Sequence, residues 1–103
     1  MLLLLSPAKK LDYDTPVRST LHTQPLFVDE AAKLIKVLKK KSASEVADLM
    51  SLSDALAKLN VERYAAWAPR FDQVNSRQAI LAFNGDVYEG LDAPSLSDRQ
   101  LEW

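Results

Sequence analysis

A short polar segment, Ser6-Pro7-Ala8-Lys9-Lys10, follows four consecutive leucines near the start of the 103-residue chain. The serine hydroxyl can donate a hydrogen bond, and the two lysine ammonium groups can contact phosphate. Open α/β sheets bind their ligands at the carboxyl ends of strands, and this segment would lie there if the leucines formed a strand. The segment therefore predicts a binding loop, while a solvated polar connection explains the same residues equally well.

Three carboxylates, Asp86, Glu89 and Asp92, fall within seven residues of a segment that also contains Gly85 and Gly90. Carboxylate oxygens are ligands for divalent cations, so the three side chains are a candidate cation site. Acidic residues more often face solvent, and that is the favoured interpretation. We therefore assign no metal ligand and expect no cofactor.

The residue inventory argues against several common catalytic sites. The chain has no cysteine, a single histidine at position 22 and only two glycines. Cysteine nucleophiles and thiolate metal sites are therefore excluded, as are glycine-rich phosphate loops. A serine–histidine–aspartate triad would have to use His22, which lies in a proline-bordered loop. We identify no catalytic residue, and these absences favour a protein that is not an enzyme without deciding the question.

Positive charge is concentrated in the first part of the chain. Residues 1–41 hold eight lysines and arginines against four aspartates and glutamates, whereas residues 42–103 hold five against ten. A basic segment favours an anionic partner, and the run Lys39–Lys41, with Lys33 and Lys36, could neutralise nucleic-acid phosphates. Lysines are also common at helix C-termini because they offset the helix dipole, and this structural explanation is favoured for the run.

The pattern of apolar residues predicts a mixed α/β fold. Residues 1–5 and 78–83 are short apolar runs without helical periodicity, as in strands that are buried on both faces. Residues 6–26 contain three prolines and predict an extended loop. Residues 29–41 repeat apolar side chains at helical spacing. We expect short buried strands with several helices, as part of a larger compact single domain.

Short helices joined by tight turns are predicted in the region 42–67. Ser42 and Glu45 have the spacing of a capping box, while Ser53 and Asn60 are suitable N-caps for the helices that follow. Antiparallel helices joined by such short turns would form a helical hairpin region.

A helical hairpin of this kind can contact nucleic-acid backbone through its turns, and Lys58 and Arg63 would supply positive charge there. Such modules usually have glycine in the turn, because glycine lets the backbone approach closely. The turns between residues 42 and 67 contain none. From the residues alone, structural packing is favoured over nucleic-acid binding.

Two segments resemble the signature motifs of the YaaA family of bacterial peroxide-stress proteins. The first is MLLLLSPAKKLD at residues 1–12, and the second is RQAILAFNGDVYEGL at residues 77–91. Their order and separation agree with the family, and the similarity spans essentially the whole chain. Family members are more than twice as long, so residues 1–103 are expected to be the N-terminal portion of a YaaA-like domain. A capping box at Ser97 opens a helix just before Trp103, which supports the same expectation.

The resemblance implies a cytoplasmic protein that limits free intracellular iron and so protects cells from peroxide. It also implies binding to duplex DNA through a positively charged cleft and a helix-hairpin-helix element. The candidate nucleic-acid-binding residues are Ser6, Lys9, Lys10, Lys58 and Arg63, and the candidate cleft residues are Asp86 and Tyr88. Lys10 departs from the small polar residue that is usual in the family.

Two other functions remain as alternatives. One is an enzyme of unknown activity with a cleft around Ser6, Lys9 and Asp86, and the other is a direct iron-binding protein. The apolar run at residues 2–5 is too short for a signal peptide or a membrane span. We therefore expect no membrane association, and the sequence indicates no protein partner.

Overall fold

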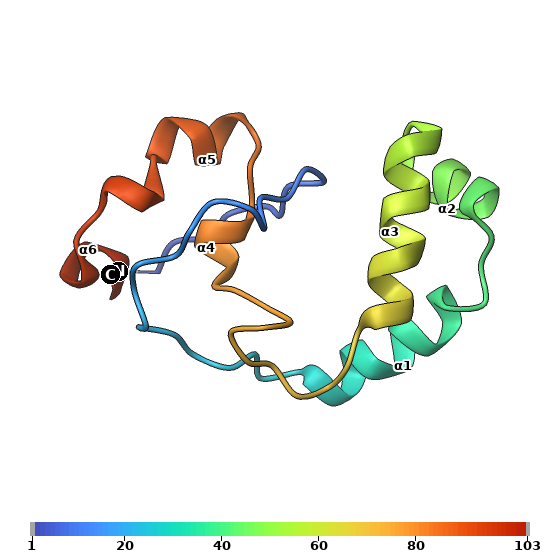
Figure 1. The fold of residues 1–103 in the computed structure, drawn as a ribbon, viewed down its shortest axis with the longest axis horizontal. Coiled ribbons are helices and arrows are strands. Elements are labelled where there is room, and N and C mark those ends of the chain that lie inside the picture. The colour runs from blue at the N-terminus through green and yellow to red at the C-terminus, as the bar shows by residue number, and fades with distance from the viewer. Residues whose placement is uncertain (1, 103) are drawn as a thin grey trace. The chain divides into compact units, whose positions relative to one another are not determined.

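The computed structural model describes residues 2–102, and Met1 and Trp103 lie outside the described residues. Its helices, in chain order, are α1 (Val28–Leu38), α2 (Ala43–Met50), α3 (Asp54–Ala66), α4 (Ala79–Ala82), α5 (Asp86–Leu91), the 3₁₀ helix η1 (Ala93–Ser95) and α6 (Asp98–Glu102) (Figure 1). They fall into two compact units. The terminal unit lies within residues 1–23 and 72–103, and the central unit is residues 24–71.

The predicted α/β fold is wrong, because the regular elements within residues 2–102 are helices and none is a strand. The leucine run at residues 2–5 has no regular secondary structure and is exposed, with Leu4 86% exposed. A strand that is buried on both faces needs neighbouring strands to pair its backbone groups. The only pairing of this kind in the described chain is a single antiparallel bridge between Leu11 and Phe83.

Residues 78–83, the second predicted strand, instead contain α4. The carbonyl of Gln78 accepts hydrogen bonds from the backbone N–H groups of Leu81 and Ala82, both at 2.9 Å. Alanine and leucine have high helix propensity, and they occupy three of the four α4 positions. The periodicity of such a short apolar run does not distinguish a strand from a helix. The helix propensity of the individual residues is therefore the better guide here.

Helix α1 confirms the helix predicted at residues 29–41, although it ends at Leu38. Asp29 and Glu30 lie in its first turn, where negative charge is favourable. Ala31 and Ile35 are half-buried on the side of α1 that faces the rest of the central unit, where α1 contacts α3. The sequence pattern thus placed the helix correctly and extended its C-terminal end by one turn.

Helices α2 and α3 pack side by side and form the core of the central unit (Figure 1). Val46 of α2 and Ala57 of α3 are both fully buried. The predicted cap at Ser53 is confirmed, because its hydroxyl accepts a hydrogen bond from the N–H of Leu56 at 3.4 Å. The assignment of this helix pair as a helix-hairpin-helix element stays a prediction.

The predicted helix start at Asn60 is wrong, since α3 continues through this position to Ala66. Asn60 is buried, and its side-chain amide donates to the carbonyl of Leu56 at 2.8 Å. A buried amide must find a hydrogen-bond partner, and the preceding turn of the same helix provides one. The residue type was compatible with a cap, but burial against the packed helices selects the helix interior.

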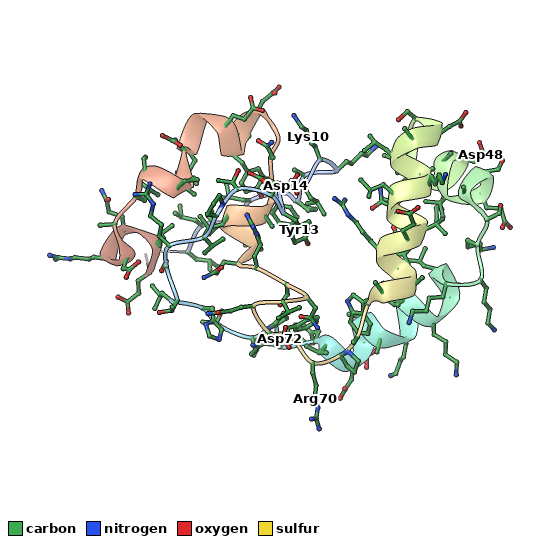
Figure 2. The ribbon with its side chains drawn as sticks, viewed as in Figure 1. Lys10, Tyr13, Asp14, Asp48, Arg70 and Asp72 are labelled. Atoms are coloured by element: carbon green, nitrogen blue, oxygen red, sulfur yellow. The ribbon has the colours of Figure 1, made fainter. Side chains whose placement is uncertain are left out.

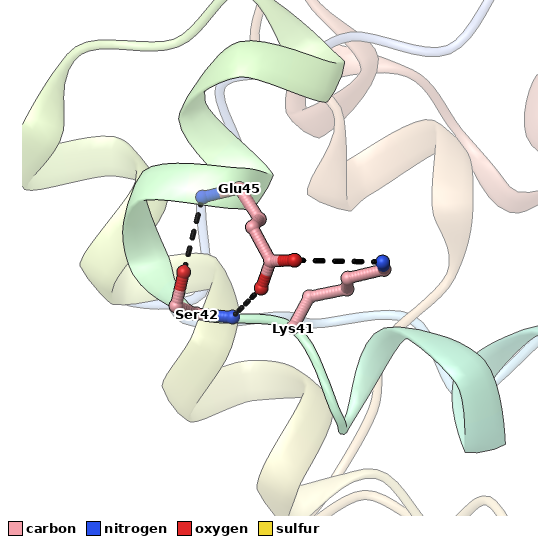
Figure 3. Close-up of polar contacts among 3 residues, drawn as sticks. All are labelled: Lys41, Ser42 and Glu45. Carbon is pink, nitrogen blue, oxygen red and sulfur yellow. Dashed lines mark hydrogen bonds and ion pairs between the residues drawn. The ribbon is translucent and has the colours of Figure 1, made fainter.

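The capping box at the start of α2 is confirmed (Figure 3). The Ser42 N–H donates to a Glu45 carboxylate oxygen at 2.8 Å, and the Glu45 N–H donates to the Ser42 hydroxyl at 3.2 Å. The Lys41 ammonium lies 3.6 Å from the other carboxylate oxygen. The Ser42 backbone N–H, then the Ser42 hydroxyl and then the charge of Lys41 lower the pKa of Glu45 below its ordinary value of 4.5.

We expect the central unit to lose stability in acid because of this cap. A carboxylate with a depressed pKa stabilises the fold above its ordinary pKa, and the contribution disappears as pH falls through the depressed value. Glu45→Ala should therefore destabilise the unit more at pH values well above 4.5 than below it, as measured by thermal unfolding. Glu62→Ala removes a carboxylate and leaves the cap intact, so it is the control. An equal effect of Glu45→Ala at both pH values would contradict the prediction.

Candidate functional site

The terminal unit joins the two signature segments through residues 6–12 and 82–88, which we call the motif junction. Two backbone hydrogen bonds hold it, from the Asp12 N–H to the Ala82 carbonyl at 2.7 Å and from the Asn84 N–H to the Lys10 carbonyl at 3.0 Å. The Leu11–Phe83 bridge lies between them. The segment that carries the lysines is therefore fixed to the second motif by its own backbone.

Tyr88 anchors the beginning of the motif junction. Its side chain is 8% exposed, and its ring packs against Phe83 with the centroids 5.3 Å apart. Its hydroxyl donates a hydrogen bond to the Ser6 carbonyl. Tyr88 thus combines apolar burial with a polar end that holds the backbone next to the candidate lysines. The structure gives this candidate cleft residue a positioning role.

Gly85 allows the two segments to approach closely. A Cβ atom at this position would lie 3.3 Å from the Cβ of Ala8, which is tighter than an ordinary contact. The φ angle of Gly85 is −106°, so backbone conformation alone does not require glycine here. The requirement is for space, because Ala8 occupies the volume that a side chain would need.

Asp12, at the end of the motif junction, organises the loop that follows. Its carboxylate accepts hydrogen bonds from the Thr15 hydroxyl at 2.5 Å, the Thr15 N–H at 2.9 Å and the Asp14 N–H at 3.0 Å. These bonds, with the Thr15 hydroxyl first, lower the pKa of Asp12, and the positive charge of Arg77 adds to the effect. Asp12 therefore shapes the loop and remains ionised at neutral pH.

Arg77 and Gln78 were missed as functional positions by the sequence analysis. Arg77 donates to the Tyr13 carbonyl at 2.9 Å, and its guanidinium lies 5.8 Å from the centre of the Tyr13 ring. Gln78 donates to the carbonyls of Ser19 and Leu21 at 3.1 and 2.9 Å. Both residues are the first two of the second signature segment, and this position in the motif was the only sequence feature that could have indicated them. They tether the N-terminal loop to the start of α4.

The candidate site residues are divided between the two units. Ser6, Lys9 and Lys10 are exposed on the loop of the motif junction, and Figure 2 shows the Lys10 side chain extending away from the ribbon. Asp86 is exposed in the first turn of α5, in the same unit. The remaining two candidates, an exposed Lys58 and a half-buried Arg63, belong to α3 of the central unit.

The acidic residues Asp86, Glu89 and Asp92 are exposed on and just after α5. Within residues 2–102, no three histidine, cysteine, aspartate or glutamate side chains are grouped closely enough to hold a metal ion. The three carboxylates therefore do not form the cation site that their spacing suggested. None of the helices in the described chain has the length and apolar character needed to cross a bilayer.

Comparison with known proteins decides the family. The family described as peroxide stress protein YaaA matches residues 1–103. The chain belongs to the YaaA family. It is 73% identical over its full length to UPF0246 proteins of Bordetella pertussis and Bordetella avium, and 62% identical to a UPF0246 protein of Albidiferax ferrireducens. It spans about 40% of the length of these curated YaaA-like relatives. The resemblance predicted from the two motifs is confirmed.

Proposed function

We propose that this YaaA-family chain contributes to duplex DNA binding in a peroxide-stress response that limits free iron and oxidative DNA damage. The observation that carries the proposal is the exposed pair Lys9 and Lys10 on the motif junction of a peroxide-stress family member. Because the chain covers about 40% of its relatives, the proposal concerns its share of the activity of a longer protein.

The motif junction is suited to phosphate binding because its backbone is held on both sides of the lysines. Tyr88 bonds the Ser6 carbonyl before them, and the Asn84 N–H bonds the Lys10 carbonyl. A loop that is already ordered loses less conformational entropy on binding than a mobile one. Lysine ammonium groups contact phosphates without reading sequence, so the resulting affinity should be independent of sequence and sensitive to salt.

Replacing both lysines tests the proposal. We expect Lys9→Gln/Lys10→Gln to weaken binding to a short DNA duplex and to lower the slope of log K against log salt by about two, one for each lost phosphate contact. Fluorescence anisotropy across a salt series measures both quantities. Arg18→Gln/Arg99→Gln removes two exposed positive charges from elsewhere and is the matched control. Absence of binding by the unmodified chain at low salt would overturn the proposal.

The link to peroxide protection needs a protein of full family length. A chimera can join this chain to the part of the Bordetella pertussis relative that the chain does not match. We expect the lysine double variant of the chimera to lose DNA affinity and peroxide protection together. Full protection without DNA binding would instead favour the enzymatic alternative centred on Ser6, Lys9 and Asp86.

A further inference from the structure

One side of α1 and the turn that follows it carry several positive charges. Lys33 and Lys36 are three residues apart and lie on the same side of α1, and Lys40 follows in the turn after the helix. The half-buried residues Ala31 and Ile35 occupy the opposite side. The three lysines are exposed, and the 14 residues from 31 to 44 contain no acidic residue.

The lysines at this end of α1 divide into two groups by their contacts. Lys33 pairs with Glu30 at 2.8 Å, and Lys41 pairs with Glu45 at 3.6 Å. Lys39 donates to the Trp67 carbonyl at 3.2 Å, next to the last residue of α3. Within residues 2–102, Lys36 and Lys40 form no ion pair or hydrogen bond through their side chains.

Compensation of the helix dipole explains part of this charge but not its excess. The dipole is equivalent to roughly half a negative charge at the helix C-terminus, and its effect is confined to the last turn. Lys36 lies in that last turn and offsets the dipole, while Lys39 at the C-cap and Lys41 beyond it each make a contact within the central unit. Lys40 exceeds what the dipole needs, and the side chains of Lys36 and Lys40 are both exposed to an external anion.

Two lysines that lie close together suit an anion that repeats its charge. Lys36 lies in the last turn of α1, and Lys40 lies in the turn that follows the helix. Phosphates of one DNA strand recur about every 3.4 Å along the helix axis, so two long lysine side chains that are close together can contact neighbouring phosphates. Lysine suits this role because it binds phosphate as a point charge and needs no fixed bidentate geometry.

We propose that Lys36 and Lys40 form a second phosphate-contact surface for nucleic acid, separate in sequence from both signature motifs. This inference rests on the proposed DNA binding and assigns part of it to α1. Lys33 lies beside the pair and adds weaker attraction, because Glu30 neutralises part of its charge. The surface contacts the sugar-phosphate backbone and contributes affinity without sequence preference.

The experiment compares Lys36→Gln/Lys40→Gln with the control Arg18→Gln/Arg99→Gln and the motif-junction variant Lys9→Gln/Lys10→Gln. All are titrated by anisotropy against the same short duplex over a salt series, using the whole chain. We expect the α1 variant to bind about tenfold more weakly at low salt and to lower the salt slope by about two relative to the control. Glutamine and lysine have similar helix propensity, so circular dichroism should show an unchanged helix content.

The outcomes separate this inference from the proposed function. If the unmodified chain binds no duplex, both proposals are overturned. If the duplex binds and only the motif-junction variant is weakened, the α1 surface is overturned while the proposed function stands. Vesicles that contain anionic lipid provide the third arm. If the α1 variant loses vesicle binding but keeps duplex binding, the partner is a lipid surface, and the assignment to nucleic acid is overturned.

Discussion

The variant Val46→Asp is expected to unfold the central unit. Val46 is fully buried in α2, where it lies against α3. A carboxylate at this position would lose its hydration and gain no charged partner, at a cost of about 3–5 kcal/mol. That cost is comparable to the whole stability of a small folding unit. Far-UV circular dichroism during urea titration, with Trp67 fluorescence in a Trp103→Phe background, measures the loss.

Leu49→Asp is the matched control for this variant. Leu49 lies three residues farther along the same helix and is 67% exposed. An aspartate there stays hydrated, and its position near the C-terminal end of α2 costs less than about 1 kcal/mol. The same helix thus receives the same charge at a buried position and at an exposed one. Similar unfolding midpoints for the two variants would show that Val46 is not part of the core.

The variant Gly85→Leu is expected to separate the two segments of the motif junction. Its Cβ would lie 3.3 Å from the Ala8 Cβ, and the rest of the side chain would need still more space. Overpacking of this kind costs about 1–3 kcal/mol. The Asn84 and Asp12 amides, which bond across the junction, should exchange with solvent faster in hydrogen-exchange experiments. Lys9 would then lose its fixed backbone, so DNA affinity should fall as well.

Gly90→Leu supplies the comparison, because Gly90 lies within α5 and Gly85 is the N-cap of the same helix. Apart from its chain neighbours and the backbone of its own helix, no described atom lies within 4 Å of the Cβ that this substitution adds. Leucine also has a higher helix propensity than glycine, so α5 should become more stable by up to about 1 kcal/mol. Opposite effects of the same substitution at Gly85 and Gly90 would support the close approach to Ala8 as a cause, in addition to the loss of glycine at the N-cap of α5. Destabilisation by Gly90→Leu equal to that by Gly85→Leu would refute this explanation.

Local sequence signals predicted the central unit well. The apolar spacing gave α1, and the serine caps at positions 42 and 53 gave the starts of α2 and α3. A cap is a contact between residues three positions apart, so sequence contains nearly all the information that it requires. The prediction for Asn60 was wrong because an asparagine can serve either as an exposed N-cap or as a buried hydrogen-bonded residue. Its surroundings in the fold decide between the two.

Contacts between distant residues were not accessible in the same way. The leucine run was expected to be a buried strand, but a strand depends on partners elsewhere in the chain, and the described residues supply only one bridge. Among the candidate site residues, the sequence indicated Ser6, Lys9 and Asp86 through their motifs. It could not indicate that Tyr88 would hold the Ser6 backbone, because that bond joins residues 82 positions apart.

This long separation has a consequence for the order in which the chain folds. Closing a loop of that length costs about 4 kcal/mol in chain entropy, whereas the Tyr64–Met50 contact of the central unit spans only 14 positions. Local contacts therefore form first. During synthesis, residues 24–71 are complete before the second half of the terminal unit exists. We therefore expect the helices of the central unit to form during synthesis before the first signature motif can pair with the second.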